Sequence, residues 1–137
     1  MSAEGYAARA AENHDKGYNC AQSVFLSFAA DMGIPEAQAA HLMQGFGGGM
    51  GGLGEVCGAL SGAVAAFSML SDALRPGDNE AKEAFYDKVK ALGEAFKAET
   101  GGLRCAELKD ADPEKKKIRC CGYMKAAARL TAEALGK

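Results

Sequence analysis

The chain has 137 residues, of which 48% are hydrophobic and 25% are charged, and its formal net charge is −2. This length suits a single domain over residues 1–137, and the near-neutral charge excludes the strongly basic surface that nucleic-acid binding requires. The apolar segment 56–70 is 15 residues long, whereas a membrane-spanning helix needs about 20, so we expect neither a nucleic acid nor a membrane as a partner. The first residues hold no continuous apolar stretch typical of a secretion signal, which favours a cytoplasmic protein.

Capping residues and apolar stripes predict an all-α fold. Ser2 and Asn19 are good N-cap residues, and Pro113 suits the first turn of a helix. The expected helices cover, in chain order, about 2–14, 20–32, 35–44, a segment ending near 72, 79–100, a short turn at 103–108, and 113–135. We therefore predict a compact bundle of about five to six helices, with a glycine-rich loop before the central buried helix.

Seven of the ten residues from Gly45 to Gly54 are glycine. The segment 47–52 reads G-x-G-x-x-G, but a dinucleotide-binding fingerprint must follow a strand, and the residues before this segment have a helical pattern. No Gly-Lys-Ser or Gly-Lys-Thr follows, which excludes a phosphate-binding P-loop. We expect a tightly folded loop that lies close to whatever Cys57 binds, because glycine permits positive φ and close backbone approach and its N–H groups can donate to sulfur or to an anion.

The five cysteines are far apart in the sequence, and none forms a CxxC pair. Cys20, Cys57 and Cys105 each fall in or near the first turn of a predicted helix, where the helix dipole favours thiolate over thiol. Because a thiolate is both a nucleophile and a metal ligand, this placement favours redox or metal chemistry. The alternative is that cysteine acts as a small buried hydrophobe, which describes one cysteine more readily than four.

The fourth position of the site offers two neighbouring cysteines. Cys120 begins a stripe at helical spacing that continues through Tyr123 and Met124, whereas Cys121 points about 100° away. We expect Cys120 to be the inward member of the pair.

These residues resemble a known family, the redox-active proteins with four cysteines and a CGAxxG motif. In this chain the motif is the segment 57–62, Cys-Gly-Ala-Leu-Ser-Gly, and the segment 17–24 resembles the family's Gly-Tyr-Asn-Cys-Ala block. The segments 105–108 and 120–124 resemble the surroundings of its third and fourth cysteines, so the likeness covers about 5–135. The resemblance implies redox activity, and an iron–sulfur site through a likeness to the non-haem part of split-Soret cytochromes. The doubled Cys120-Cys121 leaves the fourth match ambiguous by one residue.

The leading hypothesis is an electron-transfer or redox-sensing protein with one [2Fe–2S] cluster, which needs four thiolates. Its expected ligands are Cys20, Cys57, Cys105 and Cys120. The expected cofactor-binding glycines, whose amides would donate to the cluster, are Gly49, Gly51, Gly52, Gly54 and Gly58.

Two alternatives stay open at this point. One is a metal-free thiol–disulfide protein that cycles Cys57 with Cys20 or Cys105. The other is a structural zinc-binding helical module, since zinc also accepts four cysteines. An electron-transfer role implies a redox partner protein of unknown identity, and a homodimer is compatible with the sequence.

Overall fold

The computed structural model describes residues 1–137 as helices and connecting turns, with one isolated β-bridge in place of any sheet. The segments are α1 (Ala3–Asp15), α2 (Cys20–Leu26), α3 (Ala29–Met32), α4 (Glu36–Met43), α5 (Gly47–Met50), α6 (Gly58–Met69), α7 (Asn79–Thr100), α8 (Cys105–Leu108) and α9 (Pro113–Ala134). The all-α prediction is confirmed. The predicted number of helices was too low, because the helix expected over 20–32 is split into α2 and α3 and the glycine-rich loop contains the short α5.

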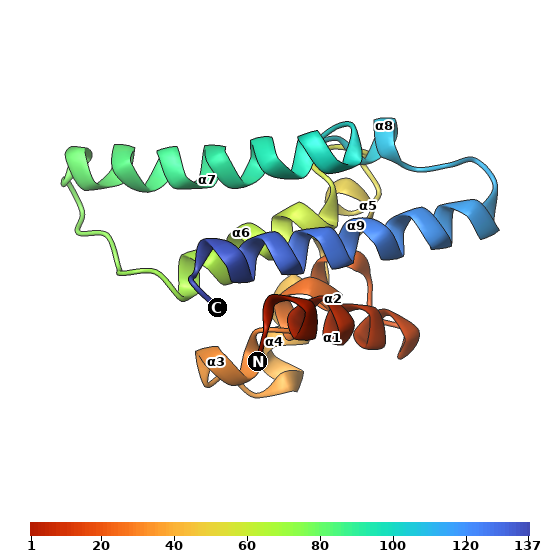
Figure 1. Cartoon of the computed structure of the whole chain (residues 1–137), viewed down its shortest axis with the longest axis horizontal. Helices are drawn as coiled ribbons and strands as arrows, with labels where there is room; N and C mark the ends of the chain where they lie inside the picture. Colours follow the sequence, from red (N-terminus) through yellow and green to blue (C-terminus); the bar gives the residue numbers. More distant parts are fainter.

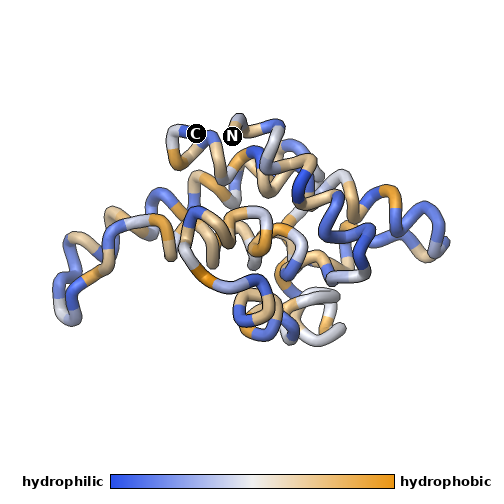
Figure 2. Tube along the Cα trace, turned by 90° about the horizontal axis from the view of Figure 1, so that it is seen from below, coloured by the Kyte–Doolittle hydropathy of each residue, from blue (hydrophilic) through white to orange (hydrophobic).

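The helices are arranged in layers around α6 and α9 (Figure 1). Helix α7 lies on one side of this pair, and α1 to α4 lie on the other. Helix α9 packs against α1, α6 and α7, and α6 also packs against α2. The core is one cluster of 24 buried residues, many of them alanine, and the two termini lie close together in Figures 1 and 2. No helix combines the length and the apolarity that crossing a membrane would require.

Two glycines bring α6 unusually close to α2. A methyl group on Gly62 would lie 2.5 Å from the carbonyl oxygen of Ala21, and one on Gly58 would lie 3.3 Å from the Ala21 nitrogen. This is the close backbone approach that glycines four residues apart allow. Gly54, which has the same spacing in the sequence, lies outside the helix because α6 begins at Gly58.

The single helix expected over 20–32 is broken in the structure. Ser27 donates its hydroxyl proton to the carbonyl of Val24 at 2.6 Å, a local bond that competes with regular helix hydrogen bonding. Phe28 leaves the helical conformation, with φ −108° and ψ 4°. This break lets the Phe28 ring stack on Tyr6 of α1 at a centroid distance of 4.4 Å.

The glycine-rich loop contains a left-handed turn. The φ angles of Gly48, Gly49, Met50, Gly51 and Gly52 all lie between 58° and 82°. A left-handed conformation costs about 1–2 kcal/mol for each residue with a side chain, and only Met50 carries that cost. The density of glycine in this segment is therefore required by its backbone.

Helix α7 is the most loosely packed long helix. Only Leu92 and Phe96 of its 22 residues are buried. Its first half projects from the molecule together with the linker 70–78, at the left of Figures 1 and 2.

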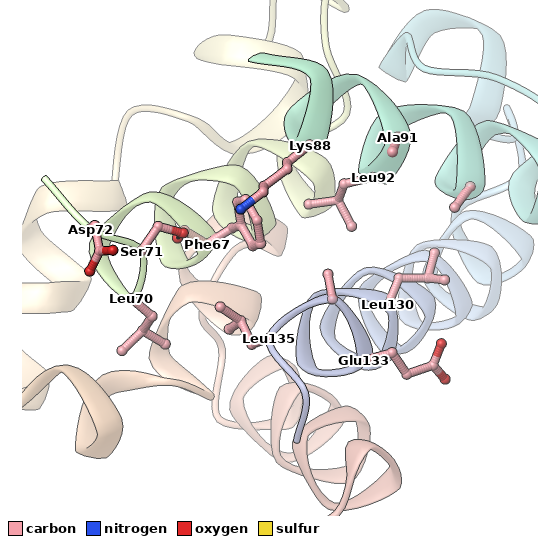
Figure 3. A pocket seen from close by; sticks show the side chains of 12 residues that line it. Phe67, Leu70, Ser71, Asp72, Lys88, Ala91, Leu92, Leu130, Glu133 and Leu135 are labelled. Atoms are coloured by element: carbon pink, nitrogen blue, oxygen red, sulfur yellow. Dashed lines mark hydrogen bonds between the residues drawn. The ribbon is translucent and has the colours of Figure 1, made fainter. Parts of the chain in front are cut away.

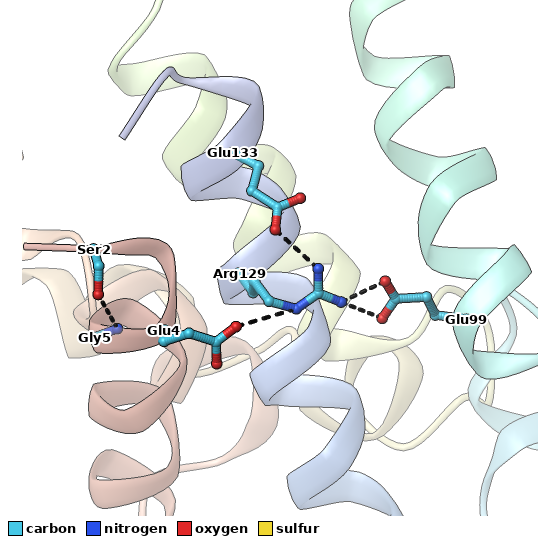
Figure 4. Close-up of polar contacts among 6 residues, drawn as sticks. All are labelled: Ser2, Glu4, Gly5, Glu99, Arg129 and Glu133. Carbon is cyan, nitrogen blue, oxygen red and sulfur yellow. Dashed lines mark hydrogen bonds and ion pairs between the residues drawn. The ribbon is translucent and has the colours of Figure 1, made fainter.

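A cluster of ion pairs ties the last half of α7 to α9 and α1 (Figure 4). Arg129 binds both carboxylate oxygens of Glu99 on α7, pairs with Glu133 at 3.0 Å and lies 4.0 Å from Glu4 on α1. The Arg129 side chain is 24% exposed, and those of its partners are between 41% and 80% exposed. The arginine therefore joins three helices at the surface.

We expect Arg129→Met to lower the free energy of unfolding by about 1 kcal/mol, the upper range for exposed ion pairs, because one side chain serves three carboxylates. Urea unfolding monitored by circular dichroism measures the change. Lys125→Met is the matched control, since Lys125 is an exposed cation of the same helix. Equal effects of the two substitutions would show that the cluster contributes nothing.

Candidate functional site

Four of the five cysteines line one small cavity, although they come from four separate elements. The cavity has a volume of about 20 Å³. It is lined by Cys20, Cys57, Gly58, Ala59, Cys105, Leu108, Lys109, Cys120 and Tyr123. The structure thus brings together all four predicted site cysteines.

The N-termini of α2 and α6 place the first two thiols. Asn19 and Gln22 form a reciprocal capping box that fixes the start of α2, so Cys20 is the first residue of a well-defined helix. Cys57 is the N-cap residue of α6. The side chain of Cys57 makes no capping hydrogen bond, but the backbone N–H groups of Ala59 and Leu60 act to lower its pKa.

The third thiol is held by main-chain bonds to the glycine-rich loop. The N–H of Cys105 donates to the carbonyl of Glu55 at 2.6 Å, and the N–H of Cys57 donates to the carbonyl of Leu103 at 2.7 Å. Between them, Val56 and Arg104 form the isolated antiparallel bridge. Two cysteines that are distant in the sequence are therefore held side by side by backbone hydrogen bonds.

Four of the five glycines predicted to bind the cofactor lie outside the cavity lining. Of Gly49, Gly51, Gly52, Gly54 and Gly58, only Gly58 lines the cavity. The others belong to the loop behind α8. A methyl group on Gly49 would lie 2.7 Å from Cβ of Cys105, and one on Gly54 would lie 3.2 Å from Cβ of Ala106. These two glycines let the loop approach α8, so they shape the site from outside.

Helix α9 contributes the fourth thiol. Cys120 lines the cavity, whereas Cys121 is absent from its lining. Tyr123, one turn further along, also lines the cavity and donates its hydroxyl proton to the carbonyl of Leu108 at 2.9 Å. The sequence placed Tyr123 on the inward stripe, but nothing in the pattern indicated that it reaches α8.

A family model described as "Putative redox-active protein (C_GCAxxG_C_C)" matches residues 18–134. The chain belongs to this family. The matched region starts later than the range 5–135 expected from the motifs, and it includes all four cavity cysteines. The family name contains GCAxxG, whereas this chain reads Cys-Gly-Ala-Leu-Ser-Gly at 57–62. No curated protein and no solved structure matches the chain.

The lining of the four-thiol cavity in this C_GCAxxG_C_C protein is largely apolar and contains no acidic side chain. Lys109 is the only charged residue in the lining, and neither a carboxylate nor a histidine contributes to it. Cys57 is 6% exposed, and burial raises its pKa to about 12, against the opposing effect of the Ala59 and Leu60 N–H groups. Burial also raises the pKa of Cys120, while Lys116 lowers it.

These shifts correct the expectation that the helix N-terminus makes Cys57 a thiolate. Its pKa is raised because loss of hydration disfavours the charged form more than two N–H donors stabilise it. The thiol therefore keeps its proton at neutral pH. Ionisation is favoured by exposure to water or by a further positive charge next to the sulfur.

The same shift makes folding stability depend on pH. The Cys57 thiol ionises near pH 9 when unfolded and near pH 12 in the folded chain, so the folded state holds this proton more tightly. Its contribution to stability is complete below about pH 9 and is lost as the pH rises towards 12. We expect Cys57→Ala to flatten the decline of the unfolding free energy between pH 9 and 12, measured by urea denaturation. A parallel decline in both proteins would contradict this.

The residues that line the cavity suit the chemistry of an iron or zinc centre, but the cavity is small for such a centre. Four thiols with N–H donors and no competing carboxylate suit a soft metal. However, about 20 Å³ is room for one water molecule, and no three metal-binding side chains are arranged to hold an ion. A cluster core therefore needs some outward movement of the lining.

The larger hollows of the molecule contain no cysteine. One of about 620 Å³ lies between α7 and the ends of α6 and α9 (Figure 3), where Phe67, Leu92 and Leu130 form part of its wall. Another, of about 610 Å³, lies between α7, α6 and the glycine-rich loop. The candidate chemistry belongs to the small cavity, because the cysteine side chains converge there and not in these two hollows.

Proposed function

We propose that this member of the redox-active family carries one [2Fe–2S] cluster on Cys20, Cys57, Cys105 and Cys120, and serves in electron transfer or redox sensing. The observation that supports this is the convergence of four thiols, from four elements, on one cavity without carboxylates or histidines. Four thiolates are the ligand set of such a cluster.

The charges near the cavity favour a negatively charged centre. An oxidised cluster with four thiolates is a net anion, and a buried anion needs donors or cations nearby. Lys109 lines the cavity, Lys116 lowers the pKa of Cys120, and the backbone N–H groups of Ala59 and Leu60 act to lower the pKa of Cys57. Donors near the sulfurs of a bound cluster also tune its reduction potential.

Each part of the chain has a separate task in this proposal. The cluster, when bound, supplies the one-electron chemistry. The four cysteines hold it, Leu108 and Tyr123 limit the access of water, and the glycine-rich loop fixes Cys105 beside Cys57. The electron donor or acceptor would be another redox protein.

Reconstitution with iron and sulfide, without oxygen, tests the proposal. We expect a coloured protein with visible absorption that bleaches on reduction by dithionite, and an electron paramagnetic resonance signal from the reduced form. A colourless, iron-free product would reject it. A colourless product that carries one zinc ion would instead indicate the structural zinc site that four thiols also permit.

A second candidate is a metal-free thiol–disulfide couple. Cys20 and Cys105 both lie close enough to Cys57 to affect its pKa, so either could be its partner. Disulfide formation would transfer two electrons and two protons to the disulfide of a partner protein, which is thereby reduced to two thiols. Thiol counting distinguishes this function: five free thiols in both the oxidised and the reduced sample would exclude it.

A further inference from the structure

Helix α8 holds Cys105 over the cavity and is fastened differently at its two ends. Its first residues are tied to the glycine-rich loop by backbone hydrogen bonds from Cys105 to Glu55 and from Ala106 to Gly54, at 2.6 and 3.1 Å. The neighbouring bridge between Val56 and Arg104 adds a further attachment. This end of α8 is therefore a fixed point.

The last residues of α8 are held by side chains, because Leu108 is buried in the core and its carbonyl is bonded from α9. The chain turns into an extended conformation at Lys109, with φ −74° and ψ 148°. There the carbonyl of Leu108 accepts the hydroxyl proton of Tyr123 at 2.9 Å. Tyr123 is itself held by an edge-on contact with Phe96, at a centroid distance of 6.5 Å. One hydroxyl group thus joins the segment that carries Cys105 to the helix that carries Cys120.

We propose that Tyr123 is a positioning residue: its hydroxyl group helps to hold the C-terminal end of α8 over the four-thiol cavity, and release of this bond favours opening of the cavity. The inference rests on the proposed function in one respect, that the cavity must admit a cluster. The residues that line it leave room for only one water molecule. Unwinding of α8 from its last residues towards its loop-bound end exposes the cavity and leaves α2, α6 and α9 in place.

The size of the effect follows from the strength of one hydrogen bond. A neutral hydrogen bond contributes about 1 kcal/mol to the closed state, which corresponds to about a fivefold change in the population of the open form. Removal of the Tyr123 hydroxyl should therefore expose Cys57 about five times more often. Cys57 is the most informative reporter because it is the buried member of the set.

Tyr123→Phe removes only the hydroxyl group and keeps the ring. Alkylation by iodoacetamide at neutral pH, followed cysteine by cysteine by mass spectrometry on the chain before reconstitution, reports opening independently of any cluster. We expect the alkylation rate of Cys57 to rise about fivefold and that of Cys121, outside the cavity, to stay unchanged. Tyr86→Phe is the matched control, because Tyr86 is an exposed tyrosine on α7.

Two results would overturn the proposal. One is an unchanged Cys57 rate in Tyr123→Phe, and the other is an equal rise at all five cysteines, which would indicate global unfolding. Should the variant not fold, hydrogen exchange of the wild-type chain decides. The Lys109 amide donates to the Cys105 carbonyl at 2.9 Å, so its exchange rate should depend on urea concentration in the same way as the alkylation rate of Cys57. A different urea dependence of the two rates would refute the role of Tyr123.

The reconstituted protein separates this inference from the proposed function. If wild type takes up iron and sulfide, Tyr123→Phe should lose iron to a chelator about five times faster. If wild type takes up none while Cys57 alkylation responds as described, the cluster proposal fails and the role of Tyr123 stands. If a cluster forms and both rates are unchanged in Tyr123→Phe, the role of Tyr123 fails alone.

Discussion

A single added methyl group at Gly58 is expected to disrupt the thiol cavity. In Gly58→Ala the new carbon would lie 2.4 Å from the sulfur of Cys20 and 2.9 Å from the carbonyl oxygen of Phe46. This carbonyl belongs to the backbone and cannot rotate away, so the start of α6 must shift relative to the segment that carries Phe46, and the sulfur of Cys20 must also move. Overpacking of this kind costs about 1–3 kcal/mol, and the displaced Cys20 should also abolish cluster binding.

Gly93→Ala is the matched control for this substitution. Gly93 lies within α7, and a methyl group there would meet no atom within 4 Å. Because alanine favours the helix over glycine by about 1 kcal/mol, Gly93→Ala should stabilise the protein and leave the cluster intact. Urea unfolding and visible absorption measure both effects. A Gly58→Ala variant with wild-type stability and absorption would contradict the described contact between α2 and α6.

The four cavity cysteines should each be essential for the cluster, and Cys121 should be dispensable. Serine has nearly the size of cysteine, but its hydroxyl group is a poor replacement for a thiolate at iron, so each substitution leaves three good ligands. We expect Cys20→Ser, Cys57→Ser, Cys105→Ser and Cys120→Ser to lose the visible absorption of the reconstituted protein.

Cys121→Ser is the control for this series. Because Cys121 is outside the cavity lining, its replacement should leave the absorption unchanged. The decisive comparison is between neighbouring residues of α9. If Cys121→Ser lost the cluster while Cys120→Ser retained it, the fourth ligand would be Cys121, and the assignment of Cys120 would be wrong.

The helices could be predicted wherever a local signal marks their ends. The side chain of Asn19 caps α2, and that of Asp112 caps α9. The apolar stripe of α9 likewise predicted Cys120 as the inward member of the pair, and Cys120 lines the cavity whereas Cys121 does not. By contrast, the break after α2 arises from the Ser27 hydroxyl and from the stacking of Phe28 on Tyr6. Such a contact between two helices has no local sequence pattern.

The glycine-rich loop shows the same limit within the site. Its composition predicted a tight loop near Cys57, but not that it binds α8 through the carbonyl groups of Gly54 and Glu55. Similarly, a position at the helix N-terminus predicted an acidic Cys57, whereas burial raises its pKa. The sequence indicates which groups are present, while the degree of burial depends on the whole fold.

The iron and acid-labile sulfide content of the chain, after reconstitution without oxygen, tests the convergence of the four thiols on one cofactor most directly. A [2Fe–2S] cluster on Cys20, Cys57, Cys105 and Cys120 predicts about two iron and two sulfide ions per chain, with these four cysteines protected from alkylation and Cys121 reactive. Background levels of iron and sulfide, with the four cavity thiols still open to alkylation, would contradict it.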